Sequence, residues 1–265
     1  AVSALFSRAQ NVARARAVAT PGPSMPPLRE GVRPPPDLLH LTCSGCGEKV
    51  NGAEAACFSC PNSASQPEKD HVLMPAAVTG AAEPDDIASN NPFIAYRRLL
   101  YSHRVAIARG MSDTEYVAMV EQLDAKLREG PGGVGFCKTP LLWRADLNAF
   151  FKVEVGSVAG SHKARHLMNV MLYLLALKKT GESSLSTRRL AVASCGNAGL
   201  AAATVAAAAS WPIDVCIPPN TSPSVVEKLH ALGADVVVCA RDVPSVETVA
   251  GPVRNQHTPS SRPPA

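Results

Sequence analysis

Strand-like and helix-like segments alternate between residues 189 and 239. The segments "RLAVAS", "IDVCIP" and "ADVVVC" are short apolar runs rich in β-branched residues, and each suits a buried strand. Two helix-like segments separate them, "LAAATVAAAAS" and "SPSVVEKLHALG". Because strands that alternate with helices are joined by right-handed crossovers, the pattern predicts an α/β fold with a parallel sheet and helices on both faces.

Three further elements are predicted upstream. Ser112 and Glu115 have the spacing of a capping box, and apolar residues then recur at helical spacing until the glycines after residue 129. Residues 150–155 alternate as a strand does. The segment "ARHLMNVMLYLLALKKTG" is apolar on nearly all sides and ends in lysines and a glycine, which indicates a buried helix.

Lys163 lies in "GSHKAR", between the predicted strand 150–155 and the buried helix. We expect this junction to open at the carboxyl edge of the parallel sheet, where such folds bind ligands. A partly desolvated lysine there would be a nucleophilic amine able to form a Schiff base. Taken alone, Lys163 is better explained as a solvated lysine at the start of a helix.

The turn "SCGNAG", residues 194–199, connects the next strand to the next helix, and we expect it to open on the same sheet edge. Gly196 and Gly199 allow a tight turn and a close approach of the backbone to a ligand. The amino end of the following helix favours an anion such as a carboxylate. Alone, such a turn is usually only a connection between a strand and a helix.

Together, "TPLL" at 139–142, "GSHKAR", "SCGNAG" and "KLHALGADVVV" at 228–238 resemble the tryptophan-synthase-β-like superfamily, the fold type II enzymes that use pyridoxal phosphate (PLP). The resemblance covers residues 91–239. It implies that Lys163 is the catalytic lysine that binds the cofactor. It further implies that Asn197 contacts the cofactor's 3'-hydroxyl, and that the loop with Ser194, Gly196 and Ala198 grips the substrate carboxylate.

The resemblance implies a PLP-dependent lyase that acts on a small amino acid and is a homodimer when full length. An amino-terminal group of four cysteines at 43–60 and the segment "NPFIAYRRLLY" favour threonine synthase. A threonine or serine dehydratase is the alternative. The superfamily's glycine-rich phosphate loop has no candidate in this chain. The chain is therefore expected to hold the first half of a catalytic domain and to bind PLP poorly or not at all by itself. A third interpretation is that the chain is not an enzyme but a truncated, non-catalytic pseudoenzyme or a zinc-ribbon interaction protein.

The cysteine unit comprises two CxxC pairs separated by ten residues. Four thiolates at this spacing can close a tetrahedral zinc site and hold together a segment too small for a core of its own. The alternatives are a ribbon that no longer binds metal and cysteines that lie at this spacing by chance. The predicted ligands are Cys43, Cys46, Cys57 and Cys60.

The sequence predicts four regions. Residues 1–40 form a leader and a proline-rich linker, 41–62 the zinc-ribbon-like segment, 91–243 the first half of the catalytic domain, and 244–265 a disordered tail outside the family. The first 29 residues contain Arg, Ser and Ala but no Asp or Glu, which is the composition of plastid or mitochondrial transit peptides. The leader therefore predicts a plastid or mitochondrial location, and a cytoplasmic location is the alternative.

The basic residues that produce the net charge of +4 lie mostly near the ends, so nucleic acid is not an expected partner. No segment is apolar enough to predict a membrane span.

Overall fold

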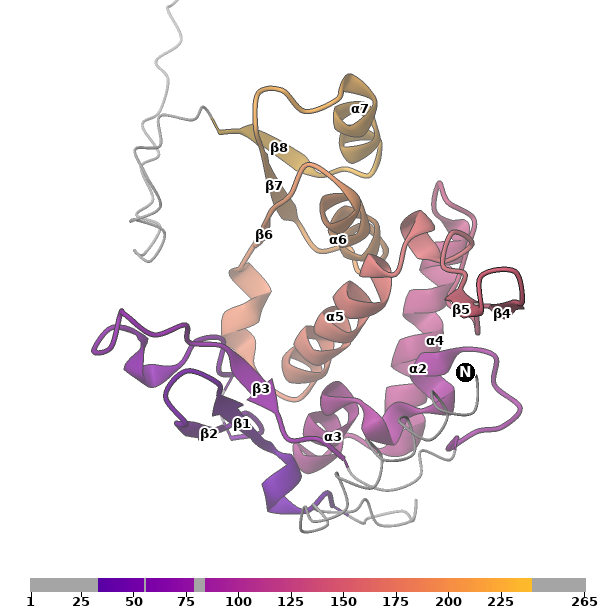
Figure 1. Cartoon of the computed structure of the whole chain (residues 1–265). Helices are drawn as coiled ribbons and strands as arrows, with labels where there is room; N and C mark the ends of the chain where they lie inside the picture. The colour runs from indigo at the N-terminus through magenta and orange to yellow at the C-terminus, as the bar shows by residue number, and fades with distance from the viewer. Residues whose placement is uncertain (1–32, 55, 79–83, 240–265) are drawn as a thin grey trace, which may run out of the picture.

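The computed structural model describes residues 33–54, 56–78 and 84–239 (Figure 1). Most of the predicted leader and the whole of the predicted tail lie outside these residues. Within them, an amino-terminal antiparallel sheet, a group of helices and a carboxyl-terminal parallel sheet follow one another along the chain. No helix in these ranges is long and apolar enough to cross a bilayer.

The amino-terminal sheet has the strand order β2-β1-β3 and is antiparallel throughout. Its third strand pairs Leu41 with Pro75 and Cys43 with Leu73. The sheet therefore extends beyond the segment 41–62 that the cysteine spacing predicts, and takes in a strand about thirty positions after the first. Its strands are β1 (His40–Cys43), β2 (Lys49–Asn51) and β3 (Leu73–Pro75).

Three α-helices and a short 3-10 helix follow this sheet. The longest, α4, begins with the predicted capping box: the Ser112 hydroxyl accepts from the Glu115 amide, and the Glu115 carboxylate accepts from the Ser112 amide. The buried face of α4 includes Tyr116, Val120 and Leu127. The elements are α2 (Pro92–Ala95), η3 (Arg97–Leu99), α3 (Tyr101–Ala108) and α4 (Asp113–Glu129).

Helix α5 (Lys163–Lys179) lies at the centre of the helical layer, as its apolar sequence predicts (Figure 1). It packs against α3, α4 and α6 (Asn197–Ala208). The face of α6 is built from small residues, including Ala202, Ala203 and Ala206, which allow the two helix backbones to approach closely. The basic last turn of α5, Lys178 and Lys179, suits the negative end of the helix dipole.

The predicted parallel sheet is present, with strand order β6-β7-β8 and parallel pairing throughout. Helices α6 and α7 pack on the face that carries the buried Ile213, Val215 and Ile217. The other face carries the exposed Ala191 and Ala193, and none of the described helices covers it (Figure 1). The α/β class is thus confirmed, whereas the described residues cover one face of the sheet and not both. The elements are β6 (Leu190–Ala193), β7 (Ile213–Ile217), α7 (Pro223–Ala231) and β8 (Asp235–Val238).

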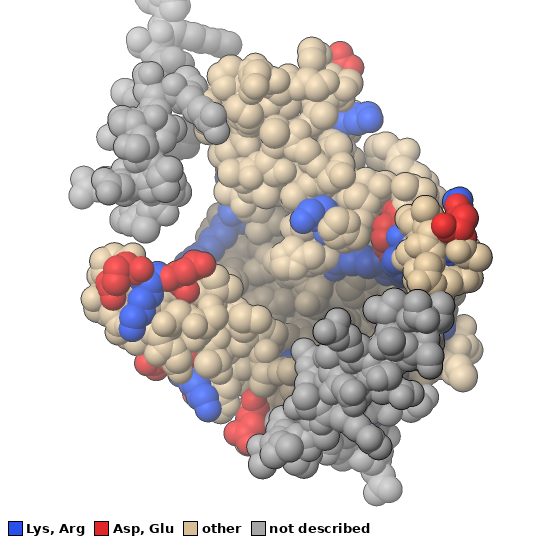
Figure 2. Space-filling model, in the orientation of Figure 1, with Lys and Arg blue, Asp and Glu red and all other residues tan. Residues whose placement is uncertain are grey.

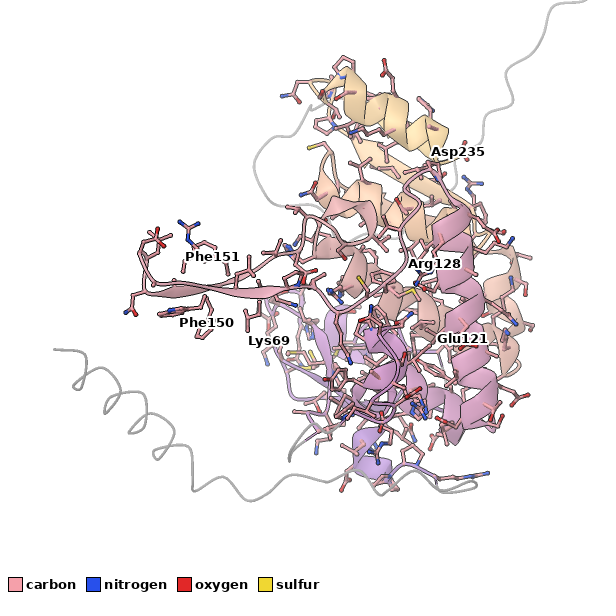
Figure 3. All side chains as sticks on the ribbon, turned by 90° about the vertical axis from the view of Figure 1, so that its right-hand side faces the viewer. Lys69, Glu121, Arg128, Phe150, Phe151 and Asp235 are labelled. Carbon is pink, nitrogen blue, oxygen red and sulfur yellow. The ribbon has the colours of Figure 1, made fainter. Side chains whose placement is uncertain are left out.

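The strand predicted at 150–155 forms as β5 (Ala149–Lys152), but it is not a member of the parallel sheet. It pairs antiparallel with β4 (Leu141–Arg144), and the hairpin projects from the body of the molecule (Figure 3). Phe150 and Phe151 lie on opposite sides of the hairpin, and both are exposed. The expectation that Lys163 follows a strand of the parallel sheet is therefore wrong, because β5 finds its partner in the preceding β4.

Asp124 connects the end of α4 to the glycine-rich loop that follows. Its Oδ1 accepts from the Phe136 amide at 2.6 Å, and its Oδ2 accepts from Arg128 Nη2 at 2.7 Å. The Asp124 side chain is buried, and so is Phe136, whose ring packs edge-on against Phe93. The Asp124 carboxylate therefore accepts the hydrogen bond that the buried Phe136 amide would otherwise make to water. It also fixes the path of the chain into the β4–β5 hairpin.

We expect Asp124→Ala to lower the free energy of unfolding by about 2–3 kcal/mol, because it leaves a buried amide without an acceptor. Chemical denaturation at neutral pH measures this. The matched control is Glu121→Ala, an exposed position on the same helix (Figure 3), which should change the value by less than about 0.5 kcal/mol. Equal effects of the two substitutions would contradict the assignment.

Candidate functional site

Lys163 is the first residue of α5 and is exposed. None of the described residues forms a hydrogen bond or an ion pair with its ammonium group. Two residues in the left-handed region precede it, Ala159 with a φ of 55° and Gly160 with a φ of 68°. This turn, which includes the 3-10 helix η4 (Val158–Gly160), leads the chain into the helix with the lysine amine free.

Ser161, two positions before the lysine, has a buried hydroxyl with no hydrogen-bond partner among the described residues. A buried polar atom normally has a partner, and an orphan of this kind calls for an explanation. A bound group that accepts or donates a hydrogen bond beside Lys163 would supply one.

The "SCGNAG" turn connects β6 to α6, as predicted. Ser194 and Gly196 lie in the connection, and Asn197 and Ala198 are the first two residues of α6. Gly199 is required for packing, since an added Cβ would overlap the carbonyl oxygen of Ser194. Gly196 occupies the N-cap position and has no side chain to cap the helix. The first-turn amides are therefore available to an anion.

The elements that carry these two motifs pack against each other. Both the 3-10 helix η4, which precedes Lys163, and α5, which Lys163 begins, contact α6. A free amine, an orphaned hydroxyl and an uncapped helix amino end are thus contributed by neighbouring elements. This donor set suits a ligand with a carbonyl carbon and anionic groups, so the residues present fit PLP and an amino-acid carboxylate.

Arg165, to which the sequence assigned no role, fixes the start of α5. Its Nε donates to Glu154 Oε2 at 2.8 Å, and its Nη2 donates to Thr139 Oγ1 at 3.1 Å. Thr139 in turn donates to Glu154 Oε1 at 2.6 Å. Thr139 of "TPLL" and Arg165 of "GSHKAR" therefore both bind the Glu154 carboxylate. This contact joins the β4–β5 hairpin to the start of α5.

The pKa of the Glu154 carboxyl lies below its ordinary value. Burial alone would raise this pKa, but the hydrogen bonds from Arg165 and Thr139 favour the ionised form and outweigh burial. Glu154 is therefore an ionised anchor at neutral pH.

The cysteine unit brings together three of its four predicted ligands. Sulfur atoms of Cys43, Cys46 and Cys60 lie with a ring nitrogen of His71 in one group, all within 4.8 Å of one another. Cys57 is not in this group, and its thiol donates to the Ser59 carbonyl at 3.2 Å. The sequence pattern missed His71 because this residue lies outside both CxxC pairs and reaches the cluster only through the pairing of β3 with β1.

Comparison with known proteins defines the family. The family model for pyridoxal-phosphate dependent enzymes matches residues 134–260, a range that runs past the predicted boundary at residue 243. A putative truncated L-serine dehydratase of Saccharomyces cerevisiae is 34% identical over an alignment of 111 residues, and the match covers 38% of this chain and 83% of that protein. The chain therefore belongs to the pyridoxal-phosphate-dependent enzyme family.

The catabolic L-serine/threonine dehydratase of Saccharomyces cerevisiae is 36% identical over 107 residues. The match covers 38% of this chain and 29% of the relative, so the chain spans less than a third of that protein. Among solved structures, maize serine racemase matches 48% of this chain and 37% of its own, with 22% identity and a TM-score of 0.35. The processed form of threonine deaminase isoform 2 from Solanum lycopersicum matches 47% and 36%, with 21% identity and a TM-score of 0.32.

We expect Arg165 and Glu154 to be coupled by about 1–3 kcal/mol in a double-mutant cycle with alanine at neutral pH. The folded pKa of Glu154 lies below the unfolded value of about 4.3, so its contribution is complete above that pH. The coupling should disappear as the pH falls through the lowered folded pKa. Chemical denaturation of the unaltered protein, the two single variants and the double variant between pH 7 and pH 3 measures this coupling energy.

The control for this cycle is the exposed pair Lys126 and Glu129, on the surface of α4. A pair of this kind contributes about 0–1 kcal/mol, with little pH dependence. A coupling of Arg165 to Glu154 no larger than that of the control would show that the carboxylate does not hold the lysine helix.

Proposed function

We propose that this chain carries the lysine-bearing part of a PLP-dependent dehydratase that removes ammonia from L-serine or L-threonine. The observation that carries the proposal is the free amine of Lys163 at the start of α5, a helix that packs against α6 with its uncapped amino end, in a member of this enzyme family. The names of the curated relatives support the dehydratase alternative over threonine synthase.

Each site residue then has a role. The Lys163 amine would hold the cofactor covalently and later move the proton of the substrate's α-carbon. The amides of the loop with Ser194, Gly196 and Ala198 would bind the substrate carboxylate, and the Asn197 amide group would bind the cofactor's hydroxyl. When bound, PLP supplies an electron sink for the α-carbon. Overall, serine would give pyruvate and ammonia, and threonine would give 2-oxobutanoate and ammonia, because the water lost from each is regained on hydrolysis.

Threonine synthase, the first expectation from the sequence, is kept as a second candidate. The observation that favours it is the amino-terminal sheet with its Cys and His cluster, which resembles the ribbon of threonine-synthase-like chains. Its substrate would be O-phosphohomoserine, whose leaving group is a phosphate on the γ-carbon.

The first test is covalent labelling. The purified chain, incubated with PLP and then reduced with borohydride, should carry the pyridoxyl group on Lys163, as peptide mass mapping would show. Lys163→Ala should abolish the label. The matched control is Lys179→Ala, an exposed lysine at the other end of the same helix, which should leave labelling unchanged. Labelling distributed over many lysines, and unaffected by Lys163→Ala, would contradict the proposed site.

The second test is substrate choice. We expect any formation of 2-oxo acid and ammonia from L-serine or L-threonine to fall by about 10³-fold or more in Lys163→Ala, because one residue anchors the cofactor and moves protons. Phosphate release from O-phosphohomoserine with threonine formation would favour the second candidate. Site-specific labelling of Lys163 without turnover of any of the three substrates would indicate a non-catalytic protein.

A further inference from the structure

We propose that Cys43, Cys46, Cys60 and His71 form a structural zinc site with three sulfur ligands and one nitrogen ligand, and that Cys57 is not a ligand. The four ligand atoms lie within 4.8 Å of one another in the part of the chain that the structure describes. The Cys43 and Cys60 side chains are buried, and the other two residues are partly buried.

The spacing of the ligand atoms is that of a tetrahedral metal site. Zinc–sulfur and zinc–nitrogen bonds of about 2.3 and 2.05 Å at tetrahedral angles place two sulfurs about 3.8 Å apart, and a sulfur and a nitrogen about 3.6 Å apart. In the structure, the sulfurs of Cys46 and Cys60 are 3.5 Å apart, and Cys43 Sγ is 3.3 Å from His71 Nδ1. The other pairs of ligand atoms lie within 4.8 Å of one another, so binding of the ion would bring some of them closer together by up to about 1 Å.

The orientation of the His71 ring is independent support for a ligand role. Its Nε2 donates to the Gln66 carbonyl at 2.9 Å, which leaves Nδ1 without a proton in the neutral ring and directed at the sulfur of Cys43. Metal-binding histidines almost always donate their other nitrogen to a carbonyl or carboxylate in this way, since the bond fixes the tautomer and the ring.

The backbone around the cluster holds both loops in position. Gly47 has a φ of 76°, and its amide donates to the Cys43 carbonyl at 2.9 Å, which closes the tight turn of the first CxxC pair. The Ser44 amide donates to the Val72 carbonyl at 2.8 Å, directly after His71. Gly45 lies so close to the Asp70 carbonyl that an added Cβ would overlap it. His71 is therefore brought to the cysteines by the fold and not by a flexible loop.

Because four protein ligands fill a tetrahedral shell, the site has no position for substrate, which is the pattern of structural zinc. The ion would connect the β1–β2 loop to the segment before β3. A three-stranded sheet of three- and four-residue strands has little apolar area of its own to bury, so this cross-link would stabilise it.

The experiment uses the full chain purified under reducing conditions. Elemental analysis should give about one zinc per chain, and X-ray absorption should fit three sulfurs at about 2.3 Å and one nitrogen at about 2.05 Å. Cys57→Ser is the matched control and should keep both the zinc content and the ligand set. Zinc binding should weaken in each of three ligand variants, Cys43→Ser, Cys60→Ser and His71→Ala. The loss in each should exceed about 10–100-fold, which is the effect of removing a residue that only orients a metal ligand.

A second variant separates loss of a ligand from loss of folding. His71→Cys should retain about one zinc and change the absorption fit from three sulfurs to four. Loss of zinc in Cys57→Ser with none lost in His71→Ala would overturn the proposal in favour of the four-cysteine set. A metal-free protein in which Cys46 and Cys60 form a disulfide would overturn it as well.

Discussion

Enclosure of α5 is the constraint on which the other parts of the structure depend. Its buried residues are distributed around the helix, so α3, α4 and α6 must all pack on it to remove them from water. Helix association of this kind leaves little freedom of rotation or sliding, because core side chains interdigitate at crystal-like density. The first residue of α5 is consequently held in one place by the burial of residues one to four turns away. Lys163 can then be exposed and still be precisely positioned, because Ala164 beside it is buried and the ion pair of Arg165 with Glu154 holds the same turn.

Local signals in the sequence were sufficient for helices α4 to α7 and for the parallel strands, but the short helices α2 and α3 were not predicted. The capping box at Ser112, the apolar helix after Lys163 and the alternation from residue 189 onward each depend on neighbours in the chain, and each is confirmed. Pairing between distant segments was not predictable in the same way. The sequence of β5 alternates as any half-buried strand does. This pattern does not indicate whether β5 pairs with β4 or joins the parallel sheet, and in the structure it pairs with β4.

The cluster of cysteines and His71 shows the same limit at the level of single residues. CxxC spacing predicts a metal-binding segment but does not select which side chains lie together, because that depends on which loop the third strand brings in. Cys57 was predicted to belong to the group from its spacing, whereas the structure brings together Cys43, Cys46, Cys60 and His71, the last through pairing of β3 with β1. The role of Arg165 was missed for a related reason: Thr139 and Glu154 lie 26 and 11 positions before it, and they converge only when the hairpin folds against α5.

The two candidate sites are attached to opposite parts of α5, which bears on how they can influence each other. The ribbon reaches the helical layer through the Tyr101 hydroxyl, which donates to the Leu39 carbonyl, and through Arg109, which donates to Ala53 and to the end of α5 at Thr180. Thr180 lies 17 positions after Lys163, or about 25 Å along the helix axis.

At that separation, with no shared partner among these contacts, effects on stability should add without coupling. A ribbon that loses its metal would therefore loosen the carboxyl end of α5 and leave the lysine turn in place. The zinc site would then act as a fastening for the amino-terminal sheet and not as a regulator of the lysine.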